Sequence, residues 1–204
     1  MTEAGPDDRF LKVLQERLAL IVLAPSPAGP EAQALLPLWP PSSPSQRVEP
    51  AKLPACDYLA EALELGVAGP ESAIATGLPQ LTQRFHGSTV IRGTLGTRGS
   101  NAMSLSLKCS ERLGSGRANG CCFGFTLIAP HTHYPAHAHP AIELYLVIAG
   151  AATWGLGDAP AEIRPPGSVI VHPSGAPHAM TTGAEPLLAL FTWRGDLATS
   201  PSYV

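Results

Sequence analysis

The order of apolar and polar positions changes character near residue 85. Before it, apolar residues recur with a period of about 3.6, as on one face of an amphipathic helix, and prolines interrupt the pattern. A loop that holds five prolines, residues 40–54, separates two pairs of helical segments. We therefore expect four helices in this half: residues 7–23, 30–39, 56–65 and 72–85.

From about residue 86 onward, short runs rich in β-branched, aromatic and leucine side chains alternate with glycine and proline. The clearest runs are residues 121–128, 142–148, 168–171 and 187–193. This spacing predicts short antiparallel strands in a sandwich or barrel. Residues 93–118 are polar and contain glycine, which is typical of a mobile loop or a plain connection. We expect a helical extension, residues 1–85, packed on a β-barrel, residues 86–204.

Composition narrows the classes of partner. The chain has 204 residues, of which 45% are hydrophobic and 14% charged, and a formal net charge of -3. Because no run of Lys or Arg offsets this charge, we expect no nucleic-acid partner and no membrane partner. The apolar run Leu18–Ala24 is too short to span a bilayer, and residues 7–17 resemble an amphipathic helix rather than a signal peptide. Four cysteines without a CxxC pair favour reduced thiols, so we expect a cytoplasmic protein.

Candidate chemistry is concentrated in the strand-rich half, where six of the seven histidines lie between residues 131 and 178. Residues i and i+2 of a strand share a face, so His137 and His139 can both point into a barrel. Glu143 follows after a short turn, and His178 arrives from a later strand. Three imidazoles and a carboxylate suit one divalent transition metal ion such as Fe, Zn, Mn, Co or Ni. They also leave coordination positions for water or substrate.

The two histidine segments resemble the two motifs of the cupins, G-x5-H-x-H-x3-4-E-x6-G and G-x5-P-x-G-x2-H-x3-N. The first matches from His137 to Gly150, although His131 stands in place of the leading glycine. The second matches from Gly167 to His178, although Thr182 stands in place of the final Asn. This resemblance implies a mainly β fold, the cupin double-stranded β-helix or jelly-roll barrel, here with a helical N-terminal extension.

Residues 120–197 are similar, more closely, to the cupin-type dimethylsulfoniopropionate (DMSP) lyases. The stretch Leu127–Tyr145 carries this resemblance, together with residues 165–167, 172–175, 177–180 and 190–196. It implies a metal-dependent β-elimination of DMSP to dimethyl sulfide and acrylate. It also assigns Tyr145 as the general base and Tyr134 as a catalytic residue that contacts the substrate.

Other site residues are less specific. The face of Trp193 is a candidate to attract the sulfonium cation by about 0.5–2 kcal/mol, although Trp193 and Tyr145 also suit simple packing inside a barrel. His131 and His133 form a second His-x-His pattern. These two histidines are either ordinary strand residues or groups that orient ligands or the substrate. We include His133 among the substrate-binding candidates. His172 lies beside a turn, where a structural role is expected. Cupins commonly dimerise, so a homodimer is a further expectation.

The same ligands leave two other functions open. One is a different metal cupin enzyme, either an iron dioxygenase or an isomerase of sugars or keto acids. The other is a cupin sensor without catalysis, a module often fused to a DNA-binding domain. Because the ligand set is intact and no helix-turn-helix pattern follows the barrel, we expect an enzyme.

Overall fold

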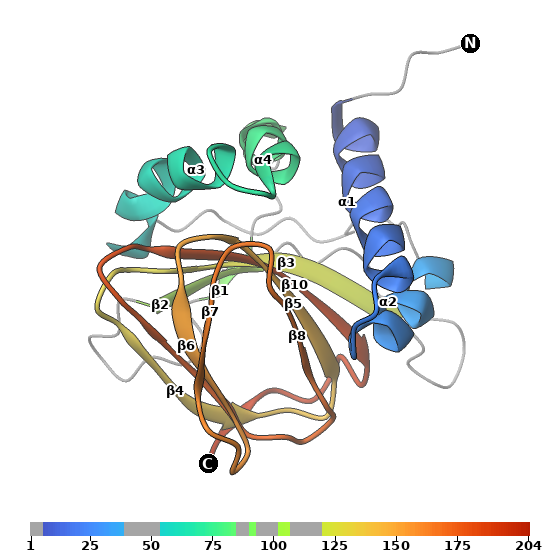
Figure 1. Ribbon diagram of the computed structural model, residues 1–204, viewed down its shortest axis with the longest axis vertical. Helices are drawn as coiled ribbons and strands as arrows, with labels where there is room; N and C mark the ends of the chain where they lie inside the picture. The colour runs from blue at the N-terminus through green and yellow to red at the C-terminus, as the bar shows by residue number, and fades with distance from the viewer. Residues whose placement is uncertain (1–5, 39–53, 85–89, 93–101, 107–119) are drawn as a thin grey trace.

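The computed structural model describes residues 6–38, 54–84, 90–92, 102–106 and 120–204, and these form helices on one side of an antiparallel β-barrel (Figure 1). The prediction of a cupin barrel with helices at the N-terminus is therefore confirmed. The proline-rich segment 40–53 and most of residues 93–118 lie outside the described residues.

The helices lie close to their expected positions. The second helix ends early and continues as a 3₁₀ turn, Leu36–Leu38, since Pro37 has no amide hydrogen for the α-helical ladder. The third follows a 3₁₀ turn, Pro54–Tyr58. In the described part of the chain, no helix combines the length and the apolar character needed to cross a membrane. The helices are α1 (Pro6–Leu23), α2 (Gly29–Leu35), α3 (Leu59–Val67) and α4 (Ser72–Arg84).

The barrel is built from two antiparallel sheets. One has the order β1-β2-β3-β10-β5-β8 and the other β11-β4-β9-β6-β7. Strand pairs far apart in sequence, such as β3 with β10, close the jelly-roll arrangement. The strands are β1 (Val90–Arg92), β2 (Ala102–Ser106), β3 (Gly120–Ile128), β4 (His133–Ala138), β5 (Ile142–Ala149), β6 (Ala152–Leu156), β7 (Glu162–Arg164), β8 (Val169–His172), β9 (His178–Thr182), β10 (Leu187–Gly195) and β11 (Ser202–Tyr203).

The central strands of the six-stranded sheet, β3, β10 and β5, are buried on both faces. Helices α1, α3 and α4 cover the outer face of this sheet (Figure 1), where Phe10 of α1 lies 6.2 Å from Phe125 between ring centroids. Leu144 and Leu146 of β5 point to this helical side, whereas Tyr145 belongs to the apolar cluster inside the barrel. Two-sided burial explains why β5 reads as an almost continuous apolar run. The one charged residue of β5, Glu143, is buried.

Gly150, which ends the first cupin-like segment, has a backbone that excludes a side chain. Its φ is +67°, and a Cβ would overlap the carbonyl oxygen of Pro186. We expect Gly150→Ala to lower the free energy of unfolding by about 2–4 kcal/mol, from backbone strain and overlap together. Urea denaturation measures this loss. Gly183→Ala is the control, since a Cβ at Gly183 meets nothing within 4 Å; equal losses in both variants would contradict the prediction.

Candidate metal centre

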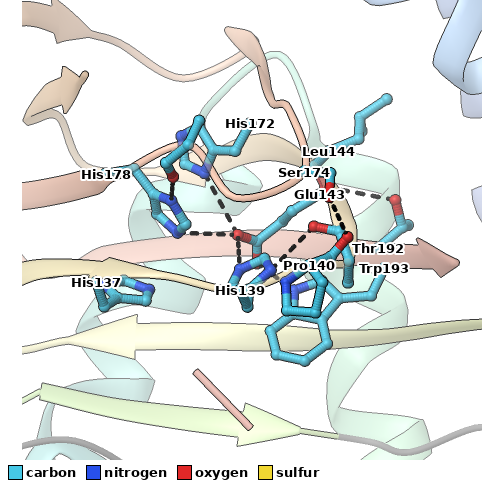
Figure 2. A network of polar contacts seen from close by, with 12 residues as sticks. His137, His139, Pro140, Glu143, Leu144, His172, Ser174, His178, Thr192 and Trp193 are labelled. Carbon is cyan, nitrogen blue, oxygen red and sulfur yellow. Dashed lines mark hydrogen bonds and ion pairs between the residues drawn. The ribbon is translucent and has the colours of Figure 1, made fainter. Parts of the chain in front are cut away.

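The predicted ligands come together from three strands and the turn after β4. His137 of β4 lies opposite His178 of β9, and His139 follows directly after β4. Glu143 of β5 reaches the same place from the other sheet (Figure 2). All four side chains are buried. Because charged and polar groups are rarely buried without partners, each of these side chains is expected to have one.

The three predicted histidine ligands share one hydrogen-bond arrangement. Each Nδ1 lies 2.9–3.0 Å from the backbone carbonyl oxygen of a residue two positions away. A carbonyl oxygen only accepts, so Nδ1 carries the hydrogen and donates it, which leaves a lone pair on Nε2. This outer hydrogen bond is the usual way in which proteins fix a metal-binding imidazole. The pairs are His137 with Pro135, His139 with Ala141, and His178 with Ala176.

The Glu143 carboxylate faces these lone pairs. Its Oε2 lies 3.1 Å from Nε2 of His139 and 3.3 Å from Nε2 of His178. The buried Nε2 of His178 makes no hydrogen bond with any described residue. Acceptor atoms so close together repel unless a proton or a metal ion lies among them. The arrangement therefore fits a cation. Two groups of three side chains, which share His178, each bring their potential ligand atoms within 4.8 Å of one another. The groups are His137–His139–His178 and Glu143–His172–His178.

The electrostatics favour the protonation states that metal binding needs. Burial raises the pKa of Glu143, but close contacts with the imidazoles of His139, His172 and His178 outweigh burial and hold this pKa well below its usual value. Burial, with a smaller contribution from His178, lowers the pKa of His137 from 6.5 to about 4. At neutral pH the site thus offers a carboxylate anion and a neutral imidazole.

The low pKa of His137 predicts a pH dependence of stability. Between pH 6.5 and about 4 the unfolded chain binds a proton at His137 that the folded protein excludes, so stability falls as pH falls through this window. For metal-free protein we expect a loss of about 2 kcal/mol from this residue between pH 7 and pH 5. Urea denaturation at both pH values checks it. His137→Gln should reduce the loss, and an equal loss in this variant would contradict the assignment.

Two residues outside the predicted ligand set also contact Glu143. The indole Nε1 of Trp193 donates a 2.6 Å hydrogen bond to Oε1, and its ring centroid lies 4.3 Å from that of His139. Trp193, expected to bind the substrate, thus lies beside the predicted metal ligands. Nδ1 of His172 lies 3.3 Å from Oε2, and its ring stacks on His178 at 3.9 Å. His172 was expected to have only a structural role, although its position inside the second motif was a usable signal.

The two predicted catalytic tyrosines lie inside the barrel with the ligands. The ring of Tyr134 packs edge-on against His137, at 4.8 Å between centroids. Tyr145 is buried, and its side chain lies close to those of Glu143 and Thr126. Burial raises the pKa of Tyr145 well above its usual value, and the Glu143 charge adds to this shift.

Two histidines of the strand-rich half, His131 and His133, lie away from the predicted ligands. His131 and His133 are exposed, and His133 makes a 2.9 Å hydrogen bond with the Thr181 hydroxyl on the strand face opposite that of Tyr134. The structure therefore does not bring His133 to the ligands, and its contact with a substrate stays a prediction.

Comparison with known proteins gives a consistent family. The sequence profile described as dimethylsulfoniopropionate lyase matches residues 32–189. The DMSP lyase DddQ of Ruegeria pomeroyi is 46% identical over 69 residues, 34% of this chain and 34% of DddQ. DddL of Cereibacter sphaeroides, which carries a provisional name as a DMSP lyase, is 32% identical over 155 residues, 72% of this chain and 62% of DddL. The chain thus spans less than two thirds of the length of either curated relative.

Solved structures agree over nearly the whole chain. The crystal structure of DddQ from R. pomeroyi superposes with a TM-score of 0.56 at 27% identity and covers 97% of both chains. A chain from the crystal structures of the DMSP lyases RdDddP and RnDddQII superposes with a TM-score of 0.64 at 23% identity. The match covers 96% of this chain and 98% of that chain, and it shows that the two share a fold. With the profile match over most of its length, the chain belongs to the dimethylsulfoniopropionate lyase family.

Proposed function

We propose that the protein is a metal-dependent DMSP lyase, which cleaves DMSP to dimethyl sulfide and acrylate. The observation that carries this proposal is a buried carboxylate facing imidazole lone pairs, with two tyrosines beside it in the barrel interior. Family membership supports the choice of substrate. His137, His139, Glu143 and His178 would hold the ion, whose identity among Fe, Zn, Mn, Co and Ni stays open.

The reaction is a β-elimination. A base removes a proton from the carbon next to the carboxylate, and the electron pair of that C–H bond forms the new C=C bond. The bond between the β-carbon and sulfur then breaks, and sulfur leaves with its electron pair as neutral dimethyl sulfide. A divalent ion supplies positive charge that stabilises the developing negative charge on the substrate and offsets the Glu143 charge felt by the tyrosines.

The side chains divide this work. Tyr145 is the proposed base, since it shares the β5 face of Glu143. It accepts the α-proton as a phenolate, so its own hydroxyl proton must first pass to solvent. The positive charge of the bound ion would offset the burial and the Glu143 charge, which raise the pKa of Tyr145. Tyr134, which belongs to the same interior cluster as Tyr145, contacts the substrate and assists catalysis. Trp193 is partly exposed, and its ring attracts the dimethylsulfonium group.

A direct assay tests the proposal. Metal-free protein is loaded in turn with Fe²⁺, Zn²⁺, Mn²⁺, Co²⁺ or Ni²⁺ and incubated with DMSP, and dimethyl sulfide and acrylate are measured by chromatography. Equal amounts of both products with at least one metal, and none without metal, are expected. No product with any metal would refute the proposal. Oxygen uptake in the same assays would instead favour the dioxygenase alternative.

A further inference from the structure

Three polar side chains form a row across neighbouring strands of the six-stranded sheet. Glu143 of β5 pairs directly with Trp193 of β10 on one side and with His172 of β8 on the other. Directly opposite residues of antiparallel strands carry their side chains on the same face, with Cβ atoms about 4.5–5.5 Å apart. The row therefore crosses the inner face of the sheet with the metal-ligand candidate at its centre.

The two neighbours engage different oxygens of the carboxylate. The indole N–H of Trp193 only donates, and its 2.6 Å contact with Oε1 is the short distance of a charge-assisted hydrogen bond. His172 approaches Oε2 through Nδ1 at 3.3 Å. An ionised carboxylate only accepts, so this Nδ1 carries the hydrogen. Glu143 is thus held from both sides of the sheet.

The two oxygens consequently have unequal surroundings. Oε1 accepts the hydrogen bond of the indole, whereas Oε2 accepts from His172 and faces Nε2 of both His139 and His178 (Figure 2). A carboxylate without such partners rotates and can give a metal ion either one oxygen or two. We propose that Trp193 and His172 are positioning residues that hold Glu143 so that Oε2 alone is offered to the ion. This inference rests on the proposed metal site and adds the way in which its carboxylate binds.

Packing strengthens this positioning role. The Trp193 ring lies against His139, and the His172 ring stacks on His178 at an interplanar angle of 28°. Each residue that holds the carboxylate therefore also restricts the imidazole of a ligand. Such outer contacts commonly change metal affinity by about 10–100-fold.

The test uses Co²⁺ binding to metal-free protein, measured by competition with a chromophoric chelator and by visible absorption. Trp193→Phe removes the N–H donor and keeps a ring, and we expect about 10–100-fold weaker binding. It should also weaken the visible bands, since a second carboxylate oxygen raises the coordination number. His172→Leu should weaken binding similarly. His172→Asn should restore binding to near the wild-type value, because the Asn amide nitrogen stands where Nδ1 stood.

Trp154→Phe is the matched control. Trp154 is a buried indole of the barrel interior whose Nε1 has no hydrogen-bond partner among the described residues, so its removal should leave Co²⁺ binding unchanged. Binding by Trp193→Phe equal to wild type would overturn the inference. Binding by His172→Asn as weak as by His172→Leu would also overturn it, since His172 would then be a ligand itself. Wild-type protein that binds no Co²⁺ would overturn the proposed metal site, and this inference with it.

Discussion

Tyr145→Phe is expected to lower the turnover of DMSP by about 10²–10⁴-fold, the usual contribution of a general acid or base. The proposed base is lost, whereas all four proposed metal ligands remain. The phenylalanine ring keeps the contacts of Tyr145 with Trp154 and Phe191, so the fold should persist. Product formation by chromatography, beside metal content by mass spectrometry, measures the two effects separately.

Tyr134→Phe is the appropriate comparison, because Tyr134 is a second buried tyrosine of the same interior cluster. Its loss should reduce turnover less than the loss of Tyr145, since it assists rather than takes the proton. If Tyr145→Phe retained turnover while Tyr134→Phe lost it, the two roles would be exchanged. If both variants retained turnover, neither tyrosine would be the base.

His178→Ala is expected to abolish metal binding and, with it, turnover. His178 belongs to both groups of potential ligands, so its removal takes one member from each group. A ligand at 100 times its Kd stabilises a protein by about 2.7 kcal/mol. For a chain of this size, that corresponds to a rise in Tm of about 5–10 °C. Thermal denaturation of wild type should show this rise on adding metal, and the variant should show none.

His133→Ala is the matched control for that experiment. It removes a histidine from the same strand as His137, but its exposed ring hydrogen-bonds to Thr181, away from the ligands. The metal-dependent rise in Tm should therefore remain. A variant that lost it would place His133 at the metal. Measuring KM for DMSP with the same variant also tests its predicted contact with the substrate.

The ligand spacing and the helices were predictable from the sequence because both depend on local rules. His137 and His139 belong to one motif, and helical periodicity is a property of neighbouring residues. The contacts of Trp193 and His172 with Glu143 were not predictable in this way. They depend on which strands pair and in which register, across separations of 50 and 29 residues. His172 was consequently given only a structural role.

Strand alternation alone also does not place the residues of β4, because this strand is irregular. Strict alternation puts His133 on the face of His137 and puts Tyr134 on the other face. The pairing of β4 with β9 shifts register between Tyr134 and His137, and both of these residues are buried while His133 is exposed. A β-bulge of this kind re-aims side chains without a clear sequence signal. It brings Tyr134 to the site and takes His133 away from it.

The burial of β5 and β10 on both faces has a consequence for engineering. Side chains such as Tyr145 and Phe191 face the barrel interior, whereas side chains such as Leu146 and Leu190 join the helical layer. A mutational library at the interior positions, with Glu143 and Trp193 kept, would vary the surroundings of the candidate metal centre. A library at the helix-facing positions would vary thermal stability and leave the interior side chains unchanged.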